Sequence, residues 1–399
     1  MMNFYNEQLI EDVFCKVLTK NDDSGRHGVL IPVFAYHLFP DFNTFDPLAK
    51  ENYEEKITTH WHESVGWVEK DSKWKHYHRY PERRMTSLSP ELLNDKPEGT
   101  ILVFGKYRDR FEYECHIFTP ENQEYEHVID LFSLNFLDEK LTGSALIPIE
   151  ELNNESGNTE VFDELMMKIQ EVNNLGYIKS LKSGDTGVGY TFETKLGIEA
   201  NSNKTPDYKG IEIKCGRSKQ VKNKRKISTG KQTLFSMVPQ WGVLKDRKEL
   251  IEKYGKKDEV RDRLGLYCTI KVVENSYKWK LEIDEIERRI YICENSERVL
   301  YYKMDDLQEA LESKHKETVF ITAHAKKGEQ GVEEFHYDSV VHCRKVMFKE
   351  FLNLIKENQI GLDFAIHKKN GKVRDHGFLW RLDNKKFLLR LFKYVREIL

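Results

Sequence analysis

Cysteine is scarce in this chain and follows no pattern. The six cysteines stand singly, without the Cys-x-x-Cys spacing of a zinc site, at positions 15, 115, 215, 268, 293 and 343. Scattered thiols argue against a disulfide framework and favour a reduced, cytoplasmic protein without structural zinc.

Long apolar runs are absent as well. No stretch approaches the roughly eighteen apolar residues of a membrane-spanning helix. The first residues, MMNFYNEQLIEDVF, lack the pattern of a signal peptide. The sequence also contains no internal repeat and no low-complexity tract. It therefore predicts a globular protein of the cytoplasm.

What the chain does have is length and an uneven distribution of charge. Its 399 residues, 39% of them hydrophobic, are enough for two or three domains with their own cores. Residues 1–150 hold 16 Lys plus Arg against 27 Asp plus Glu, a net charge of −11. The remaining residues hold 47 against 39, a net charge of +8. The C-terminal part is thus the basic one, which suits a surface that approaches phosphates.

One short stretch carries a candidate catalytic site. Pro206-Asp207 is followed, after four residues, by Glu212-Ile213-Lys214. On a strand Glu212 and Lys214 share a face while Ile213 points to the core. Two carboxylates and an ammonium group at one strand edge suit Mg²⁺ and phosphodiester hydrolysis. In a chain with 66 acidic residues this spacing also arises by chance, and the alternative is a solvated strand edge.

The residues that precede this strand strengthen the catalytic interpretation. Three glycines between positions 184 and 189 predict a flexible turn. Residues 190–196 then predict a short helix that ends at Gly197. Glu193 lies on this helix, where it can lean over the strand while its apolar neighbours face the core.

The segment from Gly184 to Arg217 resembles the MvaI/BcnI restriction endonucleases and their relative, the mismatch-repair nicking enzyme MutH. These enzymes have the PD-(D/E)xK nuclease fold. The resemblance is carried, in the family's order, by the glycine turn, Glu193 with Leu196-Gly197, the Asn201-Ser202 turn, Asp207, Glu212 and Lys214.

The resemblance implies a Mg²⁺-dependent nuclease that leaves 5′-phosphate and 3′-hydroxyl ends. Asp207 and Glu212 would bind the metal, with the Ile213 carbonyl as a further ligand. Lys214 would position or polarise the attacking water. Glu193 would bind or orient the water around the metal, unless its role is structural. The family's enzymes act as monomers with one active site and cut the two strands in sequence.

Residues 12–150 predict a β-rich domain. Short strands are expected at 13–18 and 29–32, and a hairpin at 100–107 and 112–118, followed by residues 125–132. Two polar segments interrupt them: KNDDSGRHG at 20–28 and KWKHYHRYPERRMTS at 73–87. Solvated loops are the default explanation for both segments.

The same two segments resemble the N-arm and C-arm of the EcoRII effector domain, the bacterial counterpart of the plant B-three pseudobarrel. In that family the two arms grip the major groove of DNA. The resemblance implies DNA contacts by Lys20, Asn21, Asp22, Arg26 and His27 in the first arm, and by Arg79, Arg83 and Arg84 in or beside the second.

A basic run follows the catalytic motif. RSKQVKNKRK, residues 217–226, has six basic residues and no acidic one. It is either a solvated loop or a contact to backbone phosphates. Its place beside the metal site favours phosphate contacts by Lys222, Lys224 and Arg225.

A final motif lies near the C-terminus. GKVRDHGFLWRL, residues 371–382, resembles the family's DHG…R segment, whose histidine and arginine contact base edges. A lone histidine is usually structural, and Arg374 stands where relatives often have another histidine. The resemblance implies DNA contacts by Arg374, Asp375, His376 and Arg381. On one strand His376 and Arg381 share a face only if a bulge intervenes, for which Gly377 is the expected place.

The sequence thus predicts an α/β and mainly-β protein with two domains. Residues 1–150 would form the effector-like β pseudobarrel that binds DNA, and residues 156–399 the MvaI/BcnI-like α/β nuclease domain. A polar linker is expected at 147–158. In the nuclease domain we expect helices at 159–176, 305–313 and 348–357, and strands at 264–273, 278–283, 289–293 and 318–323.

The expected function is that of a type II restriction endonuclease that cleaves double-stranded DNA. A cognate DNA methyltransferase would be encoded nearby. Two other functions stay open: a MutH-like nicking or modification-dependent nuclease, and a non-catalytic DNA-binding regulator.

Overall fold

The computed structural model describes residues 5–25, 27–43, 45–46, 49–79, 82–137, 139–152, 160–198, 206–221, 224–227, 230–328 and 331–398. The fold is mixed α/β with more sheet than helix. Two compact units emerge: unit 1 is Met1–Ser228, Lys316–Lys345 and Phe392–Leu399, and unit 2 is Thr229–His315 and Val346–Leu391. Among the described residues, no helix is both long and apolar enough to cross a membrane.

The N-terminal part of unit 1 is built mostly of strands. The strands are β1 (Ile10–Val17), β2 (Val29–Ile31), β3 (Tyr53–Glu63), β4 (Gly66–Tyr77), β5 (Glu82–Thr86), β6 (Ile101–Tyr107), β7 (Glu112–Phe118), β8 (Asn135–Leu137), β9 (Lys140–Thr142) and β10 (Ser144–Pro148). Between and after them lie the short helices η1 (Val33–Leu38), α1 (Pro90–Leu93), α2 (Tyr125–Phe132) and α3 (Ile149–Leu152).

β1 occupies the middle of this part, antiparallel to both β6 and β10. Its alternate residues Val13 and Cys15 pack into a core that Phe132 of α2 and Ile147 of β10 complete. Two expectations are corrected here. Residues 125–132, grouped with the β-rich segments, form a helix, because their apolar residues recur at helical spacing. Residues 147–152, expected to belong to a linker, form the end of β10 and α3, and residues 153–159 lie outside the described part.

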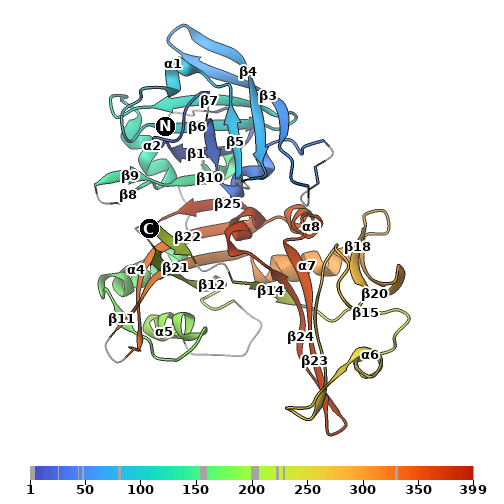
Figure 1. Ribbon diagram of the computed structural model, residues 1–399. Helices are drawn as coiled ribbons and strands as arrows, with labels where there is room; N and C mark the ends of the chain where they lie inside the picture. The colour runs from blue at the N-terminus through green and yellow to red at the C-terminus, as the bar shows by residue number, and fades with distance from the viewer. Residues whose placement is uncertain are drawn as a thin grey trace. The chain divides into compact units, whose positions relative to one another are not determined.

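The second part of unit 1 carries the candidate catalytic motif. Its elements are α4 (Glu160–Asn174), β11 (Ile178–Lys179), α5 (Gly187–Leu196), β12 (Glu212–Val221), β13 (Lys224–Ile227), β21 (Glu317–Lys327), β22 (Glu333–Val346) and β25 (Phe392–Glu397). β12 runs parallel to β21, and β21 is antiparallel to β22. Helices α4 and α5 pack their apolar residues against these strands (Figure 1).

One continuous sheet runs through unit 1. Its strand order is β13-β12-β21-β22-β25-β10-β1-β6-β7-β3-β4-β5-β2. The C-terminal strand β25 pairs with β10 through Ala145–Arg396 and Leu146–Val395. The strand that bears the catalytic motif and the strands of the N-terminal part are therefore hydrogen-bonded into the same sheet.

Unit 2 contains two antiparallel sheets. The five-stranded sheet has the order β14-β24-β23-β17-β16, and the four-stranded sheet the order β15-β20-β19-β18. β23 and β24 form a long hairpin (Figure 1). The bounds are β14 (Gln232–Ser236), β15 (Gln240–Trp241), α6 (Arg247–Tyr254), β16 (Lys256–Asp258), β17 (Arg263–Ile270), β18 (Trp279–Asp284), β19 (Arg289–Glu294), β20 (Glu297–Lys303), α7 (Met304–Lys314), α8 (Phe348–Lys356), β23 (Ile360–Lys369), β24 (Lys372–Leu382) and η3 (Lys385–Leu391).

Most elements expected after residue 158 are present with shifts of a few residues at their ends. The basic run 217–226, for which a solvated loop was one interpretation, is mostly strand. Residues 217–221 belong to β12 and residues 224–226 to β13. The second arm is likewise mostly strand, since residues 73–77 lie in β4 and residues 82–86 in β5. Charged residues interrupt the apolar alternation expected of a strand in both segments, so the sequence pattern resembles that of a loop.

Candidate active site

A tight turn precedes β12, the strand of the candidate motif. Tyr208 and Ile211 exchange backbone hydrogen bonds of 2.9 and 2.7 Å across Lys209 and Gly210. Both central residues have positive φ, +44° and +100°, as a two-residue turn of this type requires. The carboxylate of Asp207, just before the turn, accepts the N–H of Ile213 at 2.9 Å. This hydrogen bond fixes Asp207 beside the first residues of β12.

Glu212 and Lys214 share a face of β12, as the alternation predicts. The Lys214 ammonium forms an ion pair with the Glu212 carboxylate, whose side chain is 0% exposed, whereas Lys214 is 28% exposed. Ile213 points the other way and is buried among residues of α4, α5 and β21. The buried carboxylate holds the ammonium group in place at the surface.

Glu193 approaches the same groups from helix α5. The helix ends at Gly197, whose φ of +75° is the left-handed conformation that glycine adopts without strain. Burial raises the pKa of Glu193, the charges of Asp207 and Glu212 raise it further, and Lys214 lowers it. All three residues of the motif therefore act on the pKa of Glu193.

The donor set fits a hard divalent cation. Within the described ranges, no three or more His, Cys, Asp or Glu side chains gather closely enough to hold a metal by themselves. Asp207, Glu212 and the Ile213 carbonyl offer two carboxylates and one neutral oxygen, a set that suits a cation which keeps part of its water. The effect of Asp207 and Glu212 on the pKa of Glu193 shows concentrated negative charge, which such a cation would offset.

Arg217 is a residue of this site that the sequence pattern did not single out. Its guanidinium donates to the carbonyls of Asp185 at 2.7 Å and Gly184 at 2.8 Å. It also pairs with Glu333 at 3.0 Å. Arg217 thus joins the catalytic strand to the turn that starts α5, the helix of Glu193. Its only signal in the sequence is its place in the basic run three residues after Lys214.

The candidate base-reading segment lies on β24 in unit 2. The pairing of β23 and β24 shifts register between Phe364 and Ile366, which face Phe378 and Asp375, so β24 carries one extra residue there. Gly377 has a φ of +109° within this bulge. The bend expected at Gly377 is therefore present. Of Asp375 and His376 the structure describes only the backbone, while Arg374 is exposed.

Arg381 lies farther along β24 in a network of charges. Its guanidinium is 3.1 Å from Asp363, which also accepts Thr269 Oγ1 at 2.6 Å and Lys231 Nζ at 3.2 Å. The Arg381 side chain is 30% exposed. Asp363 therefore holds Arg381 in a defined orientation at a partly exposed place on the sheet.

The first arm is organised by two of the residues that the resemblance assigned to DNA. Asp22 is 7% exposed and accepts hydrogen bonds from Lys16 at 2.7 Å, Leu30 at 2.9 Å and Thr19 at 2.8 and 2.9 Å. One Arg84 nitrogen donates to the carbonyls of Asn21, His27 and Gly28. As placed here, Asp22 and Arg84 shape the arm.

Arg83 is enclosed by aromatic rings. Arg83 is 6% exposed. Its guanidinium lies 4.6 Å from the ring centroid of Tyr36 and 5.2 Å from the ring centroids of Phe42 and Phe45. A base contact would require this arginine to leave its aromatic surroundings. This placement favours packing over base reading.

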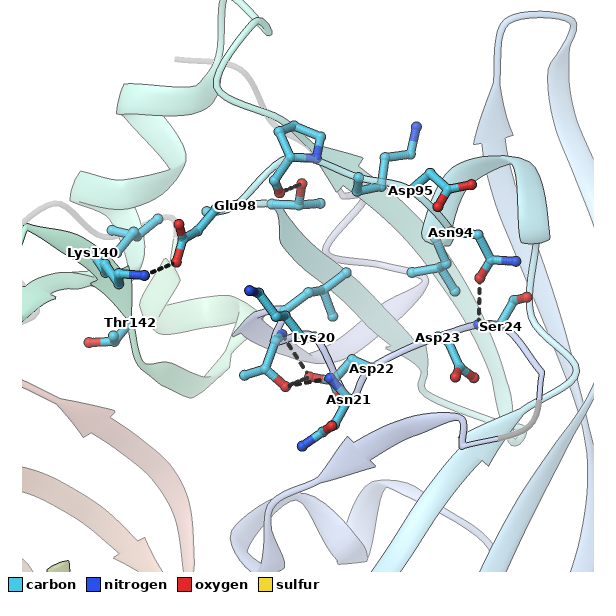
Figure 2. Close-up of a pocket in the computed structure, with 18 of the residues that line it drawn as sticks. Lys20, Asn21, Asp22, Asp23, Ser24, Asn94, Asp95, Glu98, Lys140 and Thr142 are labelled. Carbon is cyan, nitrogen blue, oxygen red and sulfur yellow. Dashed lines mark hydrogen bonds and ion pairs between the residues drawn. The ribbon is translucent and has the colours of Figure 1, made fainter. Parts of the chain in front are cut away.

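The remaining arm residues are exposed: Lys20, Asn21, His27 and Arg79. Lys20 and Asn21 also border a cavity of about 1000 Å³ between residues 18–25, 93–100 and 140–142 (Figure 2). Its lining mixes Lys20, Lys96 and Lys140 with four acidic residues, and Lys140 pairs with Glu98. Such a lining does not favour phosphate inside the cavity.

For four further candidate DNA-binding residues the structure does not describe the side chain. Arg26 and Lys222 lie outside the described residues. Lys224 and Arg225 belong to β13, where the structure describes the backbone alone.

Comparisons with known proteins give a family match and matches to solved structures. The pattern of the MvaI/BcnI restriction endonuclease family matches residues 166–392. A comparison with curated proteins gives no match. The restriction endonuclease MvaI in complex with its cognate DNA substrate is 27% identical over 61% of this chain and 100% of its own, with a TM-score of 0.48. MvaI without DNA is 27% identical over 61% and 99%, with a TM-score of 0.37. The B3 domain of the restriction endonuclease UbaLAI with cognate DNA is 33% identical over 35% and 87%, with a TM-score of 0.29.

Proposed function

Because the chain belongs to the MvaI/BcnI restriction endonuclease family and is a site-specific deoxyribonuclease, we propose that Asp207, Glu212 and Lys214 are its catalytic residues. The observation that carries this proposal is their convergence. Lys214 is paired with the buried Glu212, and Asp207 is hydrogen-bonded to the residue between them. Mg²⁺ is the proposed cofactor.

Each residue has a role that follows from its position. Mg²⁺ held by Asp207, Glu212 and the Ile213 carbonyl would offset the charge that develops on the phosphate. Lys214, fixed by Glu212 and 28% exposed, is placed to orient the attacking water with its ammonium protons. Glu193 accepts hydrogen bonds from water beside these groups. Asp207 stays in place through the Ile213 N–H.

The substrate is double-stranded DNA, recognised by two regions. Arg374, Asp375, His376 and Arg381 are the proposed DNA contacts of the nuclease domain, where Asp363 orients Arg381. Residues 1–150 are the proposed effector-like pseudobarrel, whose arms would contact DNA through Lys20, Asn21, His27 and Arg79. We propose a cytoplasmic type II enzyme whose host DNA is protected by a cognate methyltransferase.

Cleavage of unmodified plasmid DNA with Mg²⁺, followed by sequencing of the ends, tests the proposal. Asp207→Asn, Glu212→Gln and Lys214→Met should each lower the cleavage rate by at least about 10². DNA binding measured with Ca²⁺ should be retained, because Asn, Gln and Met nearly keep the sizes of the side chains they replace, including that of the buried Glu212. EDTA should stop the reaction.

Glu171→Gln, an exposed acid on α4, is the matched control and should cut at the wild-type rate. Wild-type cutting by any of the three catalytic variants would refute the assignment. Cleavage only of methylated plasmid, or nicking without linearisation, would favour a modification-dependent or MutH-like enzyme instead.

A further inference from the structure

The five-stranded sheet of unit 2 has two different faces. Leu266, Phe364 and Trp380 point to one face and are at most 1% exposed. Phe351 of α8 packs against the Trp380 ring at 5.5 Å, and α6 contacts β17 and β23. Helices therefore cover this apolar face.

The opposite face carries several exposed basic side chains. Strand register places Lys256, Gly265 and Arg374 in one row across β16, β17 and β24. Asp258 and Arg263 lie two residues away on their strands, in the next row of the same face. Lys369 and Lys372 form the closing pair of the β23–β24 hairpin, two residues beyond His367 and Arg374.

This region carries a strong excess of positive charge. Asp258 is the acidic residue among the positions just named, and it already pairs with Arg263 at 3.2 Å. We call the basic positions the tip face: Lys256, Arg263, Lys369, Lys372 and Arg374.

Aromatic rings hold part of the tip face in place. The Arg263 guanidinium lies 5.4 Å from the ring centroid of Tyr267, which is 46% exposed. The Lys256 ammonium lies 4.4 Å from the ring centroid of Tyr277. Cations ordered before binding lose less side-chain entropy when they meet an anion.

The tip face continues the face that carries Arg381. Arg381 pairs with Gly361 of β23, and Lys372 pairs with Lys369 of the same strand. Eight residues of β-strand separate these two rows, a length of roughly 26 Å. Phosphates along one DNA strand are about 3.4 Å apart along the axis, so the face is long enough to follow several of them.

We propose that the tip face binds the DNA backbone beside the recognised bases. This inference rests on the proposed function and extends it to residues outside the DHG segment. Charge complementarity identifies the partner, because five closely spaced cations beside a single carboxylate, that of Asp258, suit a polyanion with regularly spaced phosphates. The contacts would add affinity without preference for sequence.

Protection of lysines from acetylation tests the proposal on the full-length protein. The protein is treated with an acetylating reagent in EDTA, with and without a mixed-sequence duplex of about 30 base pairs at low salt. Lys256 and Lys372 should react several-fold more slowly in the complex. Lys248 and Lys253 of α6 are the internal controls and should react equally with and without DNA.

A variant provides the second measurement. In Lys256→Gln/Lys372→Gln the slope of log affinity against log salt should fall by about 2, near 0.9 for each lost phosphate contact. The matched variant Lys248→Gln/Lys253→Gln removes the same charge from α6 and should keep the wild-type slope. Equal melting temperatures would show that both variants fold.

The outcomes separate this inference from the proposed function. If Lys256 and Lys372 stay unprotected in a complex that forms, or if both double variants have the wild-type slope, the tip face does not bind DNA. Mg²⁺-dependent cutting by the wild type would then still support the proposed function. Absence of cutting would refute that function whether or not the lysines are protected.

Discussion

Arginine side chains in unit 1 hold segments together that are far apart in the sequence. Arg83 fills an aromatic enclosure, Arg84 binds three carbonyls of the first arm, and Arg217 binds two carbonyls of the turn before α5. A guanidinium is suited to this because its five donors form a rigid fork. Positive charge in the sequence therefore does not by itself mark a DNA contact.

At the scale of the residue, Arg217 is expected to position Glu193 for catalysis. Arg217→Ala frees the carbonyls of Gly184 and Asp185 and lets the start of α5 move. A displacement of about 1 Å in a catalytic group can cost roughly 10²-fold in rate. The single-turnover cleavage rate at saturating protein should therefore fall by about 10- to 100-fold, while DNA affinity with Ca²⁺ stays unchanged.

Arg84→Ala serves as the matched control, because Arg84 also donates to backbone carbonyls but at the first arm. Its single-turnover rate should remain at the wild-type value. Arg217→Lys should recover part of the lost rate, since one ammonium group can satisfy some of the carbonyls. A fall in affinity without a fall in the single-turnover rate would contradict the positioning role of Arg217.

At the scale of the element, the strand and helix of the candidate site were predictable, and the surroundings of Arg83 were not. Phe192 and Ile213 follow helix and strand periodicity, and both are buried in the same core. The surroundings of Arg83 could not be predicted, because its guanidinium lies against Tyr36 and Phe42, which are some forty residues away in the sequence. Local sequence does not encode such long-range aromatic contacts.

The compact units also could not be read from the sequence. The predicted boundary near residue 150 follows the polar segment at 147–158, whereas β25 pairs with β10 after about 250 intervening residues. Tyr394 of β25 is 1% exposed in the core formed by residues 5–152. Pairing between distant strands depends on the whole fold, and the spacing of residues along a short segment does not predict it. The proposed catalytic residues, by contrast, lie within a few residues of one another.

The strand β25 should therefore stabilise the N-terminal core. Tyr394→Ala removes a buried ring and should lower the free energy of unfolding by about 3–5 kcal/mol. Denaturant unfolding followed by tryptophan fluorescence measures this change. Phe136→Ala, at a position that is 62% exposed, is the control and should shift the free energy by no more than about 0.5 kcal/mol. Equal unfolding midpoints for the two variants would show that β25 contributes little.

At the scale of the whole molecule, the N-terminal and C-terminal parts of the chain differ in net charge. The net charge of −11 belongs to residues 1–150, whereas the catalytic strand and the tip face both lie in the part with a net charge of +8. Tight association with DNA would therefore depend mainly on the C-terminal part at low salt. Contacts by the N-terminal arms would then serve recognition more than affinity.

The number of catalytic sets predicts how a plasmid is cut. One chain carries one Asp207/Glu212/Lys214 set, so we expect a monomer that hydrolyses one strand at a time. Supercoiled plasmid should pass through a nicked circle before it becomes linear, and the protein should elute as a monomer near 47.3 kDa. Mixing wild type with an excess of Asp207→Asn under conditions of excess plasmid should leave the wild-type rate unchanged, because monomers act independently. A dimer would instead form inactive mixed pairs, and linear product without a nicked intermediate would require two active sites acting together.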